Sequence, residues 1–286
     1  MRPYTKLNSQ GNDFILTESD TTMPDISVAN IIKYSRRDNI GCDQFFIIDT
    51  TDKKNIICEV YNQDGSKACQ CGNGLRATML FLNRKYDILK TNLIVCGVSY
   101  EANIHDDKIS INMGSPKYVN ILKSSNDIDY TITQRDLVVS IISVKDDIKF
   151  SFIPLSIGNS HCIVFSEKCN NYKDQICTIL DDLFDSSMNI GFVKNADEFL
   201  KNNKTVIDLV VNEKGAGYTK SCGSGATAAA ICMFKIYERE NESKVFNSTI
   251  TIKQEGGILN VNKKYNPDTF VLIGPSSYDG EGNLEK

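Results

Sequence analysis

Two short segments of the chain place a cysteine directly before a Gly-x-Gly that opens an apolar, helix-like run. One reads QCGNGLR and contains Cys71, and the other reads SCGSGAT and contains Cys222. The start of a helix presents unpaired backbone N–H groups and the positive end of the helix dipole, which stabilise a thiolate and can hold a carboxylate. The two cysteines are therefore candidates for an acid and a base that act as a pair.

Two thiols suit a reaction that removes a proton from one face of a carbon and returns one to the other face. A helix N-terminus brings a thiol pKa of about 8.5 closer to neutrality, which is the useful range for acid and base work. The groups expected to hold a substrate α-carboxylate, and the enolate-like charge that develops beside it, are the amides of Gly72, Asn73, Gly223 and Ser224.

Other short sequence motifs recur in the same order in the two halves of the chain. QGNDF is matched by IGNSH, YNQDGS by VNEKGA, and INMGSP by VLIGPS. Such a pattern indicates an internal duplication with a period of about half the chain, which is too long for a solenoid. We expect two pseudo-symmetric domains, formed by residues 1–117 with the tail 277–286 and by residues 118–276.

Each cysteine turn predicts the start of a helix, at Gly74–Tyr86 and Gly225–Glu238, with weaker helical patterns at Ser27–Arg37 and Gln175–Phe184. Strand-like alternation dominates the rest of the chain. The run GATAAAICMFKIY is small or apolar on nearly every face, so a sheet should wrap around that helix. The expected fold is α+β (mixed α/β), with a curved, mostly antiparallel sheet around a central helix in each domain and the active site in the interdomain cleft.

The composition is that of an ordinary soluble globular protein. The 286 residues are 41% hydrophobic and 24% charged, with a net charge of −4 and no basic stripe, which argues against nucleic acid as a partner. The first residues lack the apolar core of a secretory signal, and no stretch is long enough to cross a bilayer. These features predict a cytoplasmic protein with no membrane partner.

The chain contains ten cysteines but no CxxC pair, and His105 and His161 lie far apart in sequence, so we expect no metal. Without an export signal the cysteines are interpreted as reduced thiols. Cys69 is ambiguous because it lies beside Cys71 and has no counterpart in the second copy. Those interpreted as small buried hydrophobic residues are Cys42, Cys58, Cys96, Cys162, Cys169, Cys177 and Cys232.

Several short sequence motifs together resemble those of the diaminopimelate epimerase family. They are QGNDF, GCDQ, YNQDGS, QCGNG, GNSHC, MNIGF and CGSGA, and they span Gln10 to Ala226 in the family order. The resemblance implies a cofactor-independent, two-thiol isomerase with two similar domains. Its substrate would be a small molecule, LL-diaminopimelate, converted to the meso isomer for lysine and peptidoglycan synthesis. The oligomeric state stays open, a homodimer included.

The resemblance also implies roles for individual residues. Cys71 and Cys222 would be the proton-transfer pair, and His161 and Glu213 would sit beside them and tune their protonation. The residues implied to line the substrate site are Asn12, Gln44, Asn62, Asn159 and Asn189. Neutral amides suit the distal amino-acid end of this substrate because they can contact both its ammonium and its carboxylate.

The sequence departs from the family pattern at three places. Lys214 stands where the family has arginine, and a lysine offers a point charge in place of a bidentate fork for the distal carboxylate. Tyr218 replaces the usual glutamate, and Asn8 and Ser9 replace the usual histidine-glycine pair. The change at Lys214 bears on the substrate more than on the reaction.

Other functions are compatible with parts of the pattern. A two-thiol racemase of another amino acid, such as proline or hydroxyproline, would keep both cysteine turns. A cysteine hydrolase could use Cys162 or Cys222 with His161, but it leaves the second turn unexplained. A non-catalytic amino-acid-binding protein would have little need for both thiols. Neither glycine turn continues into a nucleotide-binding fingerprint.

Overall fold

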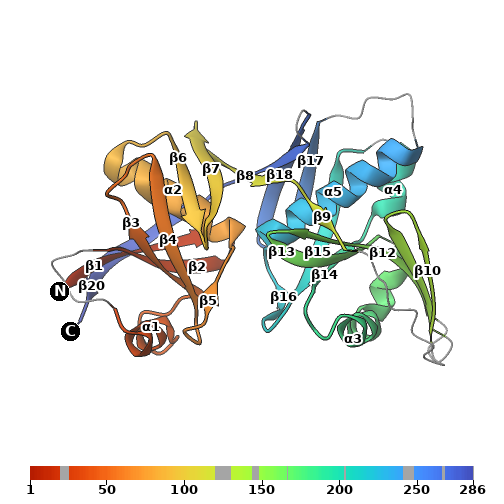
Figure 1. Ribbon diagram of the computed structural model, residues 1–286, viewed down its shortest axis with the longest axis horizontal. Helices are drawn as coiled ribbons and strands as arrows, with labels where there is room; N and C mark the ends of the chain where they lie inside the picture. The colour runs from red at the N-terminus through yellow and green to blue at the C-terminus, as the bar shows by residue number, and fades with distance from the viewer. Residues whose placement is uncertain are drawn as a thin grey trace. The chain divides into compact units, whose positions relative to one another are not determined.

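The computed structural model describes residues 1–19, 26–119, 130–143, 148–165, 167–202, 204–240, 248–265 and 268–285. The chain divides into two compact units, which are coloured mainly red to yellow and green to blue in Figure 1. Unit 1 comprises Met1–Met113 and Val271–Lys286, and unit 2 comprises Gly114–Phe270. Among the described helices, none is long and apolar enough to cross a membrane.

The unit boundaries lie a few residues before the positions expected from the sequence, 117 and 276. At the second boundary the reason is visible in the hydrogen bonds. The Pro275 carbonyl accepts from Nε of Arg76 at 3.5 Å, and the hydroxyl oxygens of Ser276 and Ser9 lie 2.6 Å apart. The chain has therefore rejoined unit 1 before residue 277.

Unit 1 is an α+β unit in which α2 packs against β1, β2 and β7, and the short helix α1 packs against β3. Its elements are β1 Arg2–Ser9, β2 Asn12–Glu18, α1 Val28–Ser35, β3 Gln44–Asp49, β4 Asn55–Asn62, β5 Lys67–Ala68, α2 Gly72–Tyr86, β6 Lys90–Val95, β7 Val98–His105, β8 Lys108–Gly114 and β20 Ser277–Leu284. Strand β20 returns from the C-terminus and pairs antiparallel with β1.

Unit 2 has a corresponding set of elements around helix α5. They are β9 Lys117–Tyr118, β10 Tyr130–Arg135, β11 Val138–Ser143, β12 Ile148–Ile157, β13 Asn159–Val164, the 3-10 helix Glu167–Tyr172, α3 Lys173–Leu183, β14 Asn189–Val193, α4 Ala196–Asn202, β15 Val206–Glu213, β16 Gly217–Thr219, α5 Gly223–Glu240, β17 Thr249–Gln254 and β18 Gly257–Lys264. Strand β19, Thr269–Gly274, spans the boundary between the units.

The two units share one pattern of strand pairing. In unit 1, β1–β2, β3–β4, β4–β5 and β6–β7 are antiparallel, whereas β2–β3 and β4–β6 are parallel. In unit 2, β12–β13, β14–β15, β15–β16 and β17–β18 are antiparallel, whereas β13–β14 and β15–β17 are parallel. Each sheet is mostly antiparallel, as the sequence predicts, and the repeated order of pairings supports an internal duplication.

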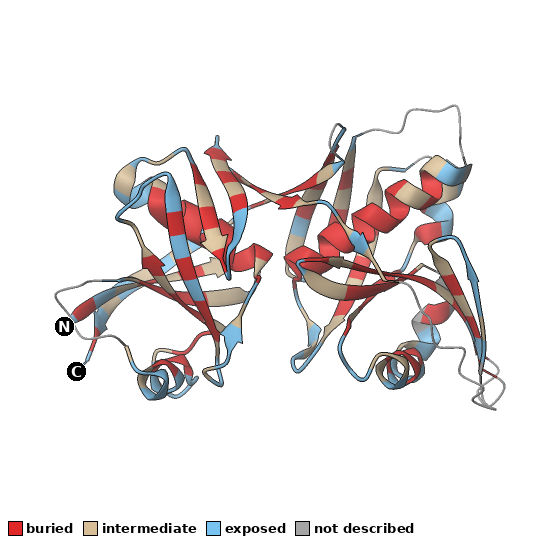
Figure 2. Cartoon of the chain, viewed as in Figure 1, coloured by how far each residue is buried: buried red, intermediate tan, exposed pale blue. Residues whose placement is uncertain are grey.

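The two central helices are buried along most of their length, which Figure 2 shows as red ribbon on α2 and α5. In α5 every residue from Gly223 to Phe234 is buried, so the apolar run of small side chains forms a helix covered on all sides, as predicted. In α2 the buried part runs from Gly72 to Leu82 and includes Arg76, which has 0% of its surface exposed. A charged side chain is rarely buried so completely, so Arg76 stands out among the residues of this helix.

Both helices begin two residues earlier than the sequence predicts, at Gly72 and Gly223 instead of Gly74 and Gly225. The side chain before each start explains the difference. Cysteine is a weak hydrogen-bond acceptor and is not among the preferred capping residues, so the sequence signal for the helix start falls on the glycines that follow.

Gly74 lies where α2 approaches the ring of Phe46 on β3. A Cβ added to Gly74 would stand 2.2 Å from Cζ of that ring, and Phe46 is itself buried, so the ring has little room to move. We expect Gly74→Ala to lower the free energy of unfolding by about 1–3 kcal/mol through overpacking. Denaturant unfolding would measure this change.

The double variant Gly74→Ala/Phe46→Leu provides the matched control, because the smaller side chain leaves space for the added methyl group. The double variant should lose clearly less free energy of unfolding than the two single variants lose together. Additive losses would contradict the steric explanation.

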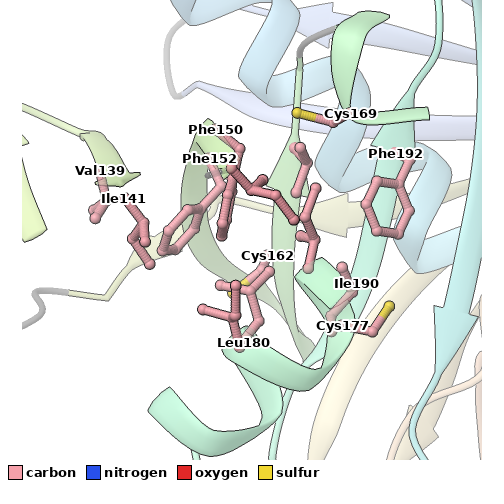
Figure 3. Close-up of a cluster of buried hydrophobic side chains, with 14 of the residues drawn as sticks. Val139, Ile141, Phe150, Phe152, Cys162, Cys169, Cys177, Leu180, Ile190 and Phe192 are labelled. Atoms are coloured by element: carbon pink, nitrogen blue, oxygen red, sulfur yellow. The ribbon is translucent and has the colours of Figure 1, made fainter. Parts of the chain in front are cut away.

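A large part of the unit 2 core lies between α3 and the strands that it covers (Figure 3). Phe150 and Phe152 on β12 pack there with Cys162 on β13 and Cys177 on α3. Both cysteines are free and buried, and so are Cys42, Cys58, Cys169 and Cys232. The interpretation of these residues as small apolar side chains therefore holds.

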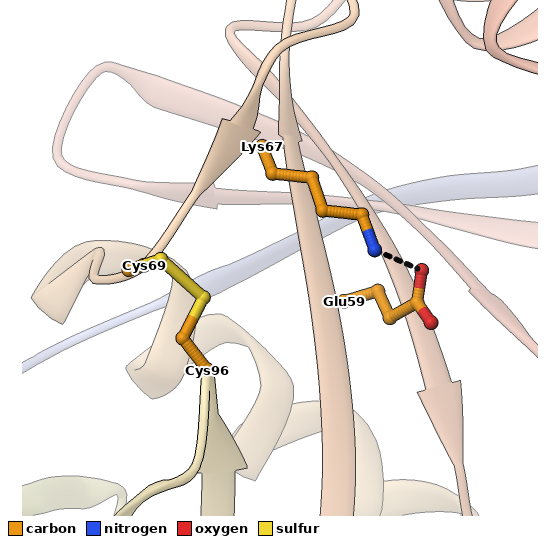
Figure 4. Close-up of a disulfide and its surroundings, with 4 residues drawn as sticks. All are labelled: Glu59, Lys67, Cys69 and Cys96. Atoms are coloured by element: carbon orange, nitrogen blue, oxygen red, sulfur yellow. Dashed lines mark hydrogen bonds and ion pairs between the residues drawn. A yellow bond between two sulfur atoms is a disulfide. The ribbon is translucent and has the colours of Figure 1, made fainter.

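Cys69 and Cys96 form a disulfide, which corrects the prediction that all ten cysteines are reduced (Figure 4). Cys96 lies in the β6–β7 turn, is exposed and has a φ of 47°, so it is not the small buried residue that the sequence suggested. The Cα atoms are 5.3 Å apart, within the usual range for a disulfide. The bond ties this turn to the segment just before Cys71.

Candidate active site

Cys71 and Cys222 have the same local geometry at the starts of α2 and α5. Sγ of Cys71 accepts the Gly74 N–H at 3.2 Å, and Sγ of Cys222 accepts the Gly225 N–H at 3.3 Å. Each sulfur therefore occupies the capping position that a serine or aspartate oxygen usually takes, at the positive end of a buried helix. The helix start acts to stabilise a thiolate at both positions, but at Cys222 burial and Glu213 outweigh this effect and raise the pKa of the thiol.

Cys71 is partly exposed, and a polar chain extends from it across β2. Its Sγ lies 3.8 Å from Oδ1 of Asn12, and Nδ2 of Asn12 donates to Oδ2 of Asp43 at 2.8 Å. Asp43 also accepts a hydrogen bond from Arg37, which neutralises its charge. Asn12 is thus held beside the thiol.

Gln44 and Asn62 face each other across the β3–β4 pair. Nε2 of Gln44 donates to Oδ1 of Asn62 at 3.0 Å, and Nδ2 of Asn62 donates to Oγ of Ser66 at 3.0 Å. These bonds leave Oε1 of Gln44 buried and without a partner among the described residues. A buried acceptor of this kind is rare in native proteins and fits an N–H donor of a ligand.

Gly72 and Asn73 form the first turn of α2, where backbone N–H groups lack carbonyl partners within the helix. The turn is fixed from both sides. Ser9 donates from its hydroxyl to the Asn73 carbonyl at 2.9 Å, and Nη2 of Arg76 donates to Oδ1 of Asn73 at 2.9 Å. Ser9, one of the departures from the family pattern, therefore has a structural role at this helix start.

In unit 2, Cys222 lies next to a serine-histidine pair. Oγ of Ser224 is 3.6 Å from Sγ of Cys222 and 3.0 Å from Nε2 of His161. His161 is fully buried, and burial lowers its pKa to about 3, so the imidazole is neutral near pH 7. A neutral imidazole bonded to the hydroxyl can orient it toward the sulfur, which indicates an indirect effect of His161 on Cys222.

Glu213 is the acidic residue beside the second thiol. Burial raises the pKa of Cys222, and the carboxylate of Glu213, which accepts a hydrogen bond from the thiol, raises it further. Oε1 of Glu213 is held by the hydroxyl of Thr219 at 2.5 Å. The carboxylate therefore favours the protonated form of Cys222 and offers a place for its proton to go.

Asn159 and Asn189 are on neighbouring strands of unit 2. Asn159 begins β13 and lies on the same face as His161, two residues later. Asn189 pairs with His161 in the parallel β13–β14 ladder. Its Nδ2 donates to the Ser160 carbonyl at 3.1 Å, and its Oδ1 accepts the Lys214 N–H at 3.0 Å. The loop that carries Lys214 is thereby fixed next to the histidine strand.

Lys214 itself is exposed. Tyr218, the second substitution relative to the family pattern, points toward α3, where its hydroxyl donates to Oδ1 of Asp174 at 2.8 Å. This contact anchors β16, the strand that follows Glu213. Within the described ranges, no group of three or more His, Cys, Asp or Glu side chains is arranged to hold a metal ion.

The geometry disfavours a hydrolase built on Cys162. That residue has 0% exposure and packs in the apolar core of Figure 3, on the strand face opposite His161. Burial raises its pKa well above the usual range, so it stays a thiol. The imidazole instead faces Ser224.

Sequence reasoning missed the roles of two side chains near Cys71 and Cys222. It assigned only the backbone amide of Ser224, whereas the hydroxyl links Cys222 to His161. It also passed over Arg76, whose guanidinium binds the first turn of α2. A charged residue five positions after a helix-capping cysteine, inside an otherwise buried helix, was the available signal.

Comparison with curated proteins finds similarity along nearly the whole chain. The diaminopimelate epimerase of Rickettsia akari is 30% identical over 265 residues, covering 89% of this chain and 90% of that protein. The diaminopimelate epimerase of Blochmanniella pennsylvanica is 29% identical and covers 98% and 99% of the two chains. That of Legionella pneumophila strain Paris is 27% identical and covers 98% of both. A scan against protein-family models finds no match.

Solved structures with the same fold are more distant in sequence. A hydroxyproline epimerase from Agrobacterium vitis has a TM-score of 0.64 at 10% identity, covering 99% of this chain and 93% of that one. A phenazine biosynthesis protein from Bacillus anthracis has a TM-score of 0.63 at 12% identity, covering 98% of both chains. At these identities the similarity shows the fold alone.

Proposed function

Because the chain belongs to the diaminopimelate epimerase family and is an isomerase, we propose that it converts LL-2,6-diaminopimelate to the meso isomer, a step in the synthesis of lysine and peptidoglycan. The reaction uses no cofactor. One cysteine takes the α-proton as a thiolate, and the other gives a proton to the opposite face of the carbon as a thiol. The roles exchange in the reverse direction.

The observation that carries this proposal is the duplicated thiol cap. Cys71 and Cys222 each accept the N–H of the residue three positions later, at 3.2 and 3.3 Å, at the start of a buried helix. A protein that only binds amino acids, or a hydrolase with one nucleophile, has no use for two such thiols. A two-base reaction needs both.

The substrate carboxylate at the reacting carbon would bind the first-turn amides of the two helices, provided by Gly72, Asn73, Gly223 and Ser224. These N–H groups also stabilise the enolate-like charge that develops as the α-proton leaves. Glu213 accepts the proton of Cys222 when that thiol becomes the base, and His161 supports the same thiol through Ser224.

The distal end of diaminopimelate carries an ammonium and a carboxylate. The buried Oε1 of Gln44 suits the ammonium, since it is an acceptor with no partner among the described residues. Asn12, Asn62, Asn159 and Asn189 supply further neutral amides. Lys214 would contribute a single ammonium toward the distal carboxylate in place of the arginine fork of the family.

Deuterium exchange tests the reaction and the substrate together. We expect the protein incubated with LL-diaminopimelate in D2O to incorporate deuterium at one α-carbon while the meso isomer appears, because the donating thiol exchanges with solvent. NMR and chiral chromatography would follow both events.

Proline, hydroxyproline and other amino acids in the same assay provide the comparison. Exchange with inversion only for one of these would reassign the substrate and keep the two-base mechanism. Absence of exchange with every amino acid would contradict the proposed function.

A further inference from the structure

Arg76 is a buried cation whose hydrogen-bond partners are all neutral. Its Nη2 donates to Oδ1 of Asn73 at 2.9 Å, its Nη1 to the Gly72 carbonyl at 3.3 Å, and its Nε to the Pro275 carbonyl at 3.5 Å. Its exposure is 0%. The guanidinium is thus fixed against the two residues that follow Cys71 in the chain.

A buried charge is costly unless an opposite charge accompanies it. In the part of the chain that the structure describes, no carboxylate forms an ion pair with Arg76. Burial lowers the pKa of Arg76 to about 10, and the thiolate of Cys71 acts in the opposite direction and raises it. The guanidinium therefore stays charged at neutral pH, and Cys71 is the ionisable group available to balance it.

The second copy lacks this cation. Thr227 lies five residues after Cys222, as Arg76 lies five residues after Cys71. The Thr227 hydroxyl donates to the Gly223 carbonyl at 2.9 Å, which is the counterpart of the bond from Arg76 to the Gly72 carbonyl. The hydrogen bond is kept in both copies, but only the first has a positive charge.

The second copy has an acidic residue at a position where the first copy has a neutral one. Glu213 aligns with Gln63 in the repeated motifs YNQDGS and VNEKGA. Gln63 is neutral, and its side chain donates to the carbonyls of Ser35 and Cys42. The carboxylate of Glu213 acts directly on Cys222. On the Cys71 side, the carboxylate of Asp43 accepts a hydrogen bond from Asn12, whose Oδ1 lies 3.8 Å from the sulfur, and it is paired with Arg37.

We propose that Arg76 is a positioning residue that fixes the resting protonation state, with Cys71 as the thiolate and Cys222 as the thiol. This inference deepens the proposed function and rests on it for its catalytic meaning. Cys71 would then be the base for the isomer that binds first to the resting protein. The isomer that needs Cys222 as its base would react only after a proton has moved between the two sites.

Alkylation without substrate tests the resting state directly. Wild-type protein would be treated with iodoacetamide across a range of pH, and the modification of each cysteine would be followed by peptide mass spectrometry. Because only the thiolate reacts, the pH of half-maximal rate should be lower for Cys71 than for Cys222 by at least about one unit. Equal midpoints, or the reverse order, would overturn the proposal.

Two variants separate the charge of Arg76 from its hydrogen bonds. Arg76→Met should raise the Cys71 midpoint by about one pH unit or more and leave that of Cys222 unchanged, whereas Arg76→Lys should keep most of the wild-type value. Thr227→Val is the matched control, since it removes the equivalent carbonyl contact without removing a charge. A midpoint for Cys71 that is unaffected by Arg76→Met would refute the assignment.

A third variant covers the case in which Arg76→Met does not fold. Glu213→Gln changes only unit 2, and it should lower the Cys222 midpoint while that of Cys71 stays constant. An unchanged Cys222 midpoint would contradict the asymmetry. These measurements contain no substrate, so their outcome is distinct from failure of the deuterium-exchange assay, which would count against the proposed function alone.

Discussion

Replacing either Cys71 or Cys222 by serine is expected to lower kcat/KM for epimerisation of LL-diaminopimelate by about 10²- to 10⁴-fold, the usual contribution of a positioned acid or base. An alcohol holds its proton far more tightly than a thiol, so serine is a poor base at neutral pH. Steady-state kinetics with the purified variants would measure the loss.

The fold should survive both changes, which makes the loss chemically interpretable. Each sulfur accepts a backbone N–H at a helix start, and serine is a preferred residue at that position. Thermal unfolding of each variant should therefore lie close to that of the wild type. Cys58→Ala removes a buried free thiol from unit 1 and should retain activity near the wild-type level.

Isotope exchange gives the two variants distinct signatures. A single remaining thiol can remove and return a proton on one face only, so each variant should exchange the α-hydrogen of just one isomer, LL or meso, without inversion. The two variants should select different isomers. Continued inversion by either variant would show that its missing thiol is dispensable and would contradict a two-base mechanism.

The sequence contains enough information for the central features of the fold. Repetition of the cysteine turns predicts the duplication, and the small residues between Gly223 and Phe234 predict a helix that is covered on all sides. The pattern does not locate the helix starts, because a cysteine cap is not a recognised signal. The Sγ contacts at Cys71 and Cys222 appear only once the backbone is folded.

Two features depended on tertiary structure that no local pattern records. The charge of Arg76 argues for exposure in isolation, but its helix lies inside a sheet and three neutral acceptors surround it. Cys69 and Cys96 are separated by 27 residues, and the pairing of β4 with both β5 and β6 brings their segments together. The buried charge and the disulfide both affect the surroundings of Cys71, which is why the site is less predictable than the fold.

Loss of the Cys69–Cys96 disulfide is expected to lower the free energy of unfolding of unit 1 by about 3–4 kcal/mol, the chain-entropy contribution of a cross-link that closes a loop of this length. The loop has a sequence separation of 27 and contains all of α2. Loss of this cross-link should lower the melting temperature of unit 1 by roughly 10 °C. Differential scanning calorimetry of the oxidised wild type and of Cys69→Ser/Cys96→Ser would measure the change.

Dithiothreitol provides the matched control. It should shift the wild type to the melting temperature of the double variant and leave the double variant unchanged, since both cysteines of the variant are gone. An equal response of both proteins to dithiothreitol would assign the effect to another thiol. Cys69 lies only two residues before Cys71, so in reducing buffer the segment before Cys71 is released from the β6–β7 turn. The double variant has no such bond to lose. Any change in its activity on adding reductant therefore reflects the chemistry of Cys71 and not the loss of the disulfide that holds the segment before α2.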